Sequence, residues 1–431
     1  MTMSDPINDA FLWGIVAWPL LLAIPALYSR LPLPRYLAIL PAAVLVFLPG
    51  ETARMLPWLF FGTGLAVDGE SRWILLMSVI LWLAAVAISH ASQRNLVHHH
   101  ATPFFLLTLA GSLGTVLATD LVGFFVFSTI MGYSFYGLLV QDGDEGAHRA
   151  GRLYLIVLVV ADLALFEALL MAAFATEDLR FEAVRQTMVG SDSAIFFVAL
   201  VSAGFALKVG AWPFYGWLAA GFASSSRATA VLLCSIPVTM GLLGAVRWLP
   251  LGQSSFYVSG TVLQFWGGMA MLYAVLRLFG SPSPRLVPAW AIVMTTGGGI
   301  VLLGVGLSYP ALWREYGELI YPLIALLGVL LASLTFTIGR LKKSDGTPAQ
   351  VDVLIWAARR IFLLQSWITA GKLGGLRLGE IWLRRRCTTS LQYIRRRENL
   401  LCTAEHRLRR WSVIITLLSL FGFAVALSAL I

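Results

Sequence analysis

The chain is dominated by apolar stretches of about twenty residues, which are separated by short polar segments. A transmembrane helix needs roughly 20 apolar residues, because each residue advances the helix by about 1.5 Å and the hydrocarbon core is about 30 Å thick. The pattern therefore predicts an all-α integral membrane protein with about 12 transmembrane helices. The predicted spans cover residues 11–28, 36–49, 73–91, 103–119, 121–140, 153–174, 194–218, 228–249, 256–279, 288–308, 319–340 and 411–431.

The span over 194–218 departs from this pattern, because a lysine interrupts it after about fourteen apolar residues. Lys208 is followed closely by Gly210 and Pro213. A proline lacks the backbone N–H and clashes with the preceding turn, so we expect the helix to break just after the lysine. A charge beside broken backbone is tolerated in a membrane only where protein or a water-filled cavity surrounds it.

The composition supports the membrane assignment. Hydrophobic residues make up 58% of the 431 positions and charged residues only 12%, whereas soluble domains carry about 25% charged residues. The ten residues before the first span lack a basic region and a cleavage pattern, so we interpret that span as retained rather than as a signal peptide. The three cysteines show no spacing that suggests a disulfide framework or a metal site.

The net charge of +9 is unevenly distributed, because residues 340–410 hold 16 of the 31 lysines and arginines. Shorter basic loops follow alternate spans, which predicts that these loops are cytoplasmic and that both termini lie on the periplasmic side of the inner (plasma) membrane. We divide the chain into a helix bundle (1–340), a basic segment (341–410) and a C-terminal span (411–431).

The basic segment alternates apolar residues with arginines but is too interrupted to cross a bilayer. One interpretation is an amphipathic helix on the cytoplasmic surface, with residues 350–400 bound to anionic lipid. Docking along neighbouring membrane subunits is the alternative, and the two are compatible. We expect no nucleic-acid partner, because the sequence shows no fold for one.

Two carboxyl groups interrupt the predicted span 153–174, namely Asp162 and Glu167. Five residues correspond to about 140° around a helix, so the two side chains do not share a face. Either could reach Lys208, and the other then needs a different partner or a proton. A pair whose charge depends on the separation of its members is a candidate proton relay. A static buried ion pair is the alternative.

The span over 121–140 is polar without being charged, with Ser128, Thr129 and Tyr133 among its hydroxyls. Hydroxyls in membrane helices commonly mediate close helix packing, and a short water wire is the alternative. Asp120 precedes this span and is expected to be its N-cap. The adjacent residues 98–100 are all histidine, which favours a solvated loop over a metal site. No cofactor motif or catalytic triad is found, so we expect no cofactor and no metal.

The run after the lysine resembles the antiporter-like membrane subunits that complex I shares with Mrp antiporters, membrane-bound hydrogenases and inorganic-carbon uptake complexes. The resemblance covers roughly residues 100–300. It implies a core of membrane helices, a switch lysine in a broken helix, and other subunits as partners. The residues that carry it are Lys208, Pro213, Phe214, Trp217 and Leu218.

The sequence also departs from that family. The family's glutamate in the span before is matched here by Thr129, and the histidine of the next span aligns with Leu233. Residues 225–227 replace the family's Pro-Thr-Pro turn, and no membrane lysine follows the span over 288–308. The resemblance therefore indicates a shortened and divergent relative that has largely lost the second half-channel.

These observations favour a proton-conducting subunit of a larger energy-coupled complex, such as a quinone reductase, a hydrogenase or an inorganic-carbon uptake system. Protons are the expected ion and sodium is the alternative. The chain has no catalytic site of its own, so any enzymatic role is that of a non-catalytic subunit of an oxidoreductase complex. The competing hypothesis is a structural or anchoring subunit that no longer conducts protons.

Overall fold

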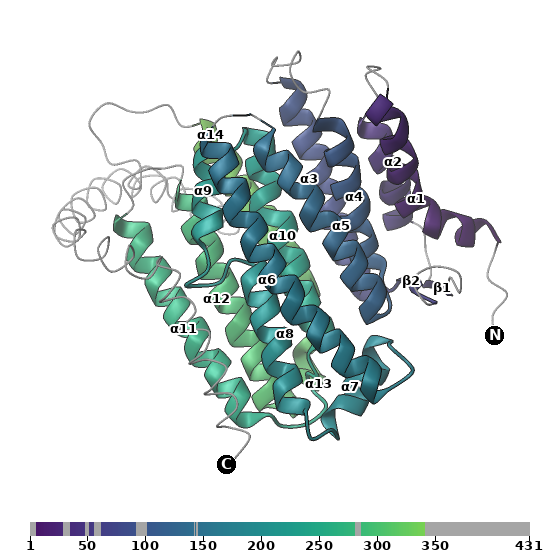
Figure 1. Ribbon diagram of the computed structural model, residues 1–431, viewed down its shortest axis with the longest axis vertical. Helices are drawn as coiled ribbons and strands as arrows, with labels where there is room; N and C mark the ends of the chain where they lie inside the picture. Colours follow the sequence, from purple (N-terminus) through teal and green to yellow (C-terminus); the bar gives the residue numbers. More distant parts are fainter. Residues whose placement is uncertain are drawn as a thin grey trace, which may run out of the picture.

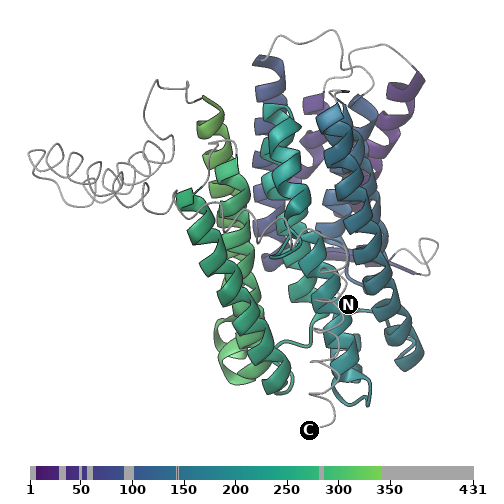
Figure 2. The same ribbon diagram turned by 60° about the vertical axis from the view of Figure 1, so that its left-hand side comes forward.

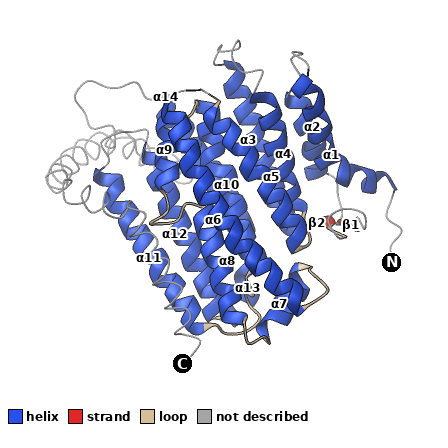
Figure 3. Cartoon of the chain, viewed as in Figure 1, coloured by secondary structure: helices blue, strands red, loops and turns tan. Residues whose placement is uncertain are grey.

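The structure is a computed structural model, and it describes residues 6–28, 35–47, 51–55, 62–91, 101–141, 143, 145–280 and 286–340. Nearly all of these residues are helical, and one small two-stranded hairpin accompanies the helices (Figure 3). The first elements are α1 (Pro6–Tyr28), α2 (Arg35–Phe47), β1 (Thr52–Met55), β2 (Gly64–Val67), α3 (Gly69–Ala91), α4 (Ala101–Leu117), α5 (Leu121–Val140) and α6 (Glu145–Ala175). They are followed by α7 (Phe181–Val189), α8 (Ala194–Lys208), α9 (Gly216–Ser224), α10 (Arg227–Trp248), α11 (Tyr257–Gly280), α12 (Val287–Ser308), α13 (Pro310–Tyr316), the 3-10 turn η2 (Gly317–Leu319) and α14 (Ile320–Arg340).

The long helices run side by side along one common direction, with α1 and α2 at one edge of the bundle and α11 at the other (Figure 1). Helices α11, α12 and α14 form a separate layer, drawn in green in Figure 2. Helix α10 lies in the centre, and its apolar stretch is completely buried by other helices. A helix that is apolar on all sides and also buried forms the core of a bundle.

Seven of the described helices are long and apolar enough to cross a membrane, and four more apolar helices are shorter. The chain is therefore a multi-pass membrane protein. Each of the first eleven predicted spans overlaps one of these helices or, at 194–218, the pair α8 and α9. The twelfth predicted span and the basic segment lie outside the described residues, so the count of twelve stays a prediction.

Three elements depart from the predicted pattern. Helix α6 begins at Glu145, well before the predicted start at residue 153. The loop after α2 contains the β1–β2 hairpin, and the loop after α6 contains the amphipathic helix α7. The hairpin and α7 lie outside the apolar stretches, and their sequences are too short for a hydrophobic period to identify them.

Asp120 joins the hairpin to the bundle. Its carboxylate accepts hydrogen bonds from Gly123 N at 2.7 Å, from Gly64 N at 2.9 Å and from the Thr63 hydroxyl at 2.7 Å. The predicted N-cap of α5 is thus confirmed. Because all three donors are aimed at one buried carboxylate, the same residue that begins α5 also fixes β2 against it.

We expect Asp120→Ala to lower the free energy of unfolding by about 3 kcal/mol, since it removes a helix cap and leaves buried donors unpaired. Thermal unfolding of the detergent-solubilised protein measures the loss. Asp178→Ala is the matched control. Asp178 lies outside the membrane spans and its hydrogen bond to Arg180 lowers the pKa of its carboxyl, yet an exposed pair contributes little. Equal midpoints for the two variants would contradict the assigned role of Asp120.

Candidate functional site

Helix α8 ends at Lys208 because the backbone closes there in a Schellman motif. The Ala211 N–H donates to the Ala206 carbonyl at 2.9 Å and the Gly210 N–H donates to the Leu207 carbonyl at 3.1 Å. Gly210 has a φ of 65°, in the left-handed region that glycine adopts without strain. A side chain there would also meet Leu218 at 2.4 Å. Glycine at position 210 therefore allows helix α8 to end at this point.

The helix ends just after Lys208 as predicted, but Pro213 does not cause the break. The expected clash with the carbonyl of the preceding turn does not occur, because the helix has already ended at Lys208. The Trp212–Pro213 peptide bond is cis, and helix α9 begins at Gly216. The break between α8 and α9 is consequently a short non-helical segment rather than a kink within one helix.

The Lys208 side chain lies between three helices. Its Nζ atom donates a hydrogen bond to the Ser128 hydroxyl of α5 at 2.7 Å and is 2.8 Å from Oδ1 of Asp162 on α6. Lys208 is 8% exposed and Asp162 is 7% exposed. A cation in the last turn of a helix is also favoured by the partial negative charge of that end. The bundle thus holds a buried ion pair beside broken backbone.

The ion pair is only partly satisfied by hydrogen bonds. The contact to Lys208 is close but not aligned as a hydrogen bond, and neither Asp162 oxygen accepts one within the described part of the chain. A cavity of about 10 Å³ lies beside Lys208, lined in part by Ser128, Tyr154 and Trp217. This volume is close to the minimum that holds one water molecule. The space beside the ion pair is therefore enough for about one water molecule.

Of the predicted polar residues of α5, only Ser128 contacts the lysine. Thr129 is the next residue, about 100° further around the helix, and its buried hydroxyl has no hydrogen-bond partner among the described residues. Tyr133 is 39% exposed. Ser128, rather than Thr129, is therefore the α5 hydroxyl that meets Lys208.

The structure separates the two carboxyl groups of α6. Asp162 faces the bundle interior, whereas Glu167 lies exposed on the outer side of the helix. Glu167 forms no ion pair or hydrogen bond with Lys208 in the described structure. Of the two alternatives, only Asp162 is the charge partner of the lysine. Leu233, the position aligned with the family's histidine, is fully buried in α10.

An aromatic cluster lies on the α7 side of the lysine. Phe205 is one turn before Lys208, and its ring centroid is 6.0 Å from that of Phe124 and 5.8 Å from that of Trp248. The Phe124 and Trp248 centroids are 6.2 Å apart. All three side chains are almost completely buried. They form an apolar barrier between the ion pair and the end of the bundle that carries α7.

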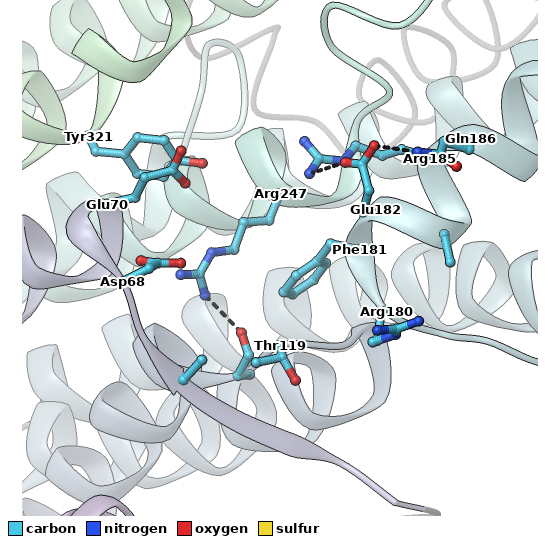
Figure 4. A pocket seen from close by; sticks show the side chains of 13 residues that line it. Asp68, Glu70, Thr119, Arg180, Phe181, Glu182, Arg185, Gln186, Arg247 and Tyr321 are labelled. Atoms are coloured by element: carbon cyan, nitrogen blue, oxygen red, sulfur yellow. Dashed lines mark hydrogen bonds and ion pairs between the residues drawn. The ribbon is translucent and has the colours of Figure 1, made fainter. Parts of the chain in front are cut away.

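Beyond this barrier lies a second, larger cavity of about 440 Å³ at the α7 end (Figure 4). Arg247 points into it from α10, with Asp68 and Glu70 on one side and Glu182 with Arg185 on the other. Glu182 pairs with Arg185 at 3.0 Å. The cavity therefore collects charged groups of both signs, next to an otherwise apolar bundle.

Arg247 also has a structural role that the sequence pattern did not predict. Its Nη1 atom donates to the carbonyls of Val116 at 2.8 Å and Ala118 at 3.1 Å, which are left free where α4 ends. The guanidinium also lies 5.6 Å from the centre of the Phe181 ring. An arginine inside the predicted span 228–249 was the available signal.

Among the described residues, no group of three or more histidine, cysteine or acidic side chains is placed to hold a metal ion.

The described helices, the broken α8–α9 pair and the buried lysine resemble those expected of an antiporter-like membrane subunit. Residues 118–279 match the family described as "NADH:quinone oxidoreductase/Mrp antiporter, TM". The resemblance drawn from the run after Lys208 is thus confirmed, and the match covers that run and the helices around it.

Individual relatives agree with this assignment. Over 263 residues the chain is 30% identical to a probable K(+)/H(+) antiporter subunit of Rhizobium meliloti, covering 57% of this chain and 47% of the relative. It is 27% identical over 217 residues to "Formate hydrogenlyase subunit 3" of Escherichia coli, covering 48% of this chain and 34% of that protein. The chain therefore matches half or less of the length of these two relatives.

Solved structures show the same fold. A chain of the Mrp complex from Dietzia sp. DQ12-45-1b matches with a TM-score of 0.67 at 20% identity, covering 90% of this chain and 80% of that chain. A chain of respiratory complex I from Thermus thermophilus with bound NADH matches with a TM-score of 0.64 at 22% identity, covering 97% and 86%. At these identities the matches establish the architecture.

The Schellman motif yields a direct test. We expect Gly210→Ala to lower the free energy of unfolding by about 2 kcal/mol, because alanine is strained at positive φ and its Cβ would meet Leu218. Gly216→Ala is the matched control, since no atom lies within 4 Å of a Cβ at that position. Thermal unfolding in detergent compares the two. A Gly210→Ala protein as stable as the control would contradict this account of the helix end.

Proposed function

We propose that this chain is an ion-translocating membrane subunit of a larger energy-coupled complex, and that Lys208 and Asp162 form its proton relay. The observation that carries the proposal is the buried ion pair, with Nζ of Lys208 2.8 Å from Oδ1 of Asp162 at the end of a broken helix. Ionisable residues inside membrane proteins are costly and commonly mark ion pathways. Here the two charges stabilise each other, and the other polar contact is the Ser128 hydrogen bond to Lys208.

The relay works through the distance between the two groups. While the pair is closed, each charge favours the ionised form of the other. When α6 and α8 separate, desolvation favours the neutral forms, so Lys208 releases a proton and Asp162 takes one up. The Ser128 hydroxyl keeps the lysine nitrogen in place, and the 10 Å³ cavity provides room for the water that carries the proton.

The surroundings give the relay a direction. The barrier of Phe124, Phe205 and Trp248 separates the ion pair from the charged cavity around Arg247, so the route toward that cavity is closed in this conformation. Water then reaches Lys208 from the opposite side, beside the non-helical segment that precedes α9. The driving energy comes from partner subunits, because the sequence shows no cofactor motif in this chain.

The names of the relatives guide the choice of complex. They describe antiporter subunits, a formate hydrogenlyase subunit and a component of an NAD(P)H-quinone oxidoreductase. For this chain we propose a complex of that class, either a quinone reductase, a hydrogenase or an inorganic-carbon uptake system, in the inner membrane with both termini outside. Protons are the proposed ion and sodium the alternative. The segment 341–410 would contact anionic lipid or neighbouring subunits.

In the reconstituted complex we expect Lys208→Ala and Asp162→Asn each to reduce proton flux at least tenfold without loss of subunits, because either change removes one charge of the switch. Flux is measured with a pH-sensitive dye inside proteoliposomes, and subunit content by gel analysis. Thr129→Val serves as the matched control, since this neighbouring hydroxyl contacts neither charge, and its flux should stay within twofold. Undiminished flux in the Lys208→Ala complex would remove the relay.

A structural or anchoring role is the second candidate, and Ser128 favours it. The α5 side chain that meets Lys208 is a hydroxyl, which does not ionise as the family's glutamate does. The ion pair would then serve only to hold α6 against α8. Deletion of residues 350–400 should, on this view, prevent assembly of the complex.

The double variant Lys208→Met/Asp162→Leu distinguishes the two candidates. Replacing a buried ion pair by apolar residues of similar size is often neutral for stability. A structural role therefore predicts a complex that assembles and works normally with the double variant. The relay predicts an assembled complex whose proton flux is lost.

A further inference from the structure

The outer side of α6 is an unusual membrane surface. Its exposed residues recur at intervals of three and four positions, as one face of a helix does. The face extends for 18 residues, or about 27 Å, which is close to the thickness of the hydrocarbon core. We call it the α6 outer face, and it consists of Ile156, Val159, Val160, Leu163, Phe166, Glu167, Leu170 and Phe174.

Glu167 is the one charged residue on this face, and it lies well inside the apolar stretch. It is seven residues, or about 10 Å, from Phe174 and fourteen residues, or about 21 Å, from Leu153, the two ends of the apolar sequence. A carboxylate in contact with lipid tails at that depth is unfavourable by several kcal/mol. Glu167 therefore needs either a proton or a partner other than lipid tails.

The described residues provide no such group. No ion pair or hydrogen bond to Glu167 is found among them, and its neighbours on the face are aliphatic or aromatic. The remaining apolar stretch of the chain, residues 411–431, contains no lysine or arginine. Neither the described residues nor the sequence of 411–431 thus provides a cation at the depth of Glu167.

We propose that the α6 outer face is the docking site for a transmembrane helix of a neighbouring subunit, which places a lysine or arginine opposite Glu167. The large apolar side chains at Leu163, Phe166 and Phe174 would pack against that helix over its whole length. The ion pair at Glu167 would set its register, because a shift along the helix would leave a charge unpaired in hydrocarbon.

Helix α11, which lies at one edge of the bundle, provides the contrast (Figure 1). Its exposed side includes Phe265, Met269, Leu272 and Leu276, and none of its exposed described residues is charged. Such a surface is satisfied by lipid alone. The difference between the exposed sides of α6 and α11 is independent of proton conduction, so the docking site stands or falls separately from the proposed relay.

Photo-crosslinking in native membranes tests the docking site. A benzoyl-phenylalanine placed at Leu163 or at Phe174, which is 91% exposed, should crosslink to one membrane protein. Mass spectrometry of the adduct should map the crosslink to a transmembrane segment that carries a lysine or arginine within about two turns of the crosslinked residue. The same probe at Leu272, which is 56% exposed on α11, is the matched control and should yield lipid adducts.

The dependence on charge is tested with Glu167→Leu and Glu167→Gln in the Leu163 crosslinking background. We expect Glu167→Leu to reduce the crosslinked fraction at least fivefold at an unchanged level of the chain in the membrane, with Glu167→Gln intermediate. The proposal is overturned if the α6 probes capture only lipid, residues 341–431 of the same chain or a second copy. It is equally overturned if the captured segment lacks a basic residue or if Glu167→Leu leaves the crosslink unchanged.

Discussion

The packing around Lys208 depends on one constraint: its ammonium group lies inside the membrane and has to be stabilised there. Lys208 is placed there by the sequence of α8, and an isolated charge at that depth is too costly to remain unpaired. Three helices meet it: α5 brings Ser128, α6 brings Asp162, and the end of α8 adds its own partial negative charge. The packing of α5, α6 and α8 is therefore tied to one electrostatic contact.

Arg247 shows the same constraint at the α7 end of the bundle. Its guanidinium replaces water for the carbonyls at the end of α4, and Asp68 and Glu70 lie around it in the 440 Å³ cavity. Between Arg247 and Lys208 lie the packed rings of Phe124, Phe205 and Trp248. Two charged regions separated by an apolar barrier are the arrangement that an alternating pathway requires, and they equally suit a rigid scaffold.

The site beside Lys208 is built from two neighbouring helices of a shared architecture. The architecture matches chains of the Mrp complex and of complex I over most of the sequence. The α5 side chain that meets the lysine is a serine, which carries no charge. The charge partner comes instead from α6. The pair thus joins α6 to α8 at the helix break. Any change in the distance between its two charges requires a motion between these two helices.

The sequence alone determined the helical spans and several local features of this protein. The apolar stretches, the central Lys208, the break after it and the N-cap at Asp120 follow from local chemistry, because burial in lipid and backbone hydrogen bonding act on each segment separately. The choice between Asp162 and Glu167, and between Ser128 and Thr129, was decided only by the tertiary structure. Neighbouring positions on a helix differ by about 100°, and the way two helices face each other depends on packing that no single segment contains. For the same reason Arg247 became informative only once α4 was seen to end beside it.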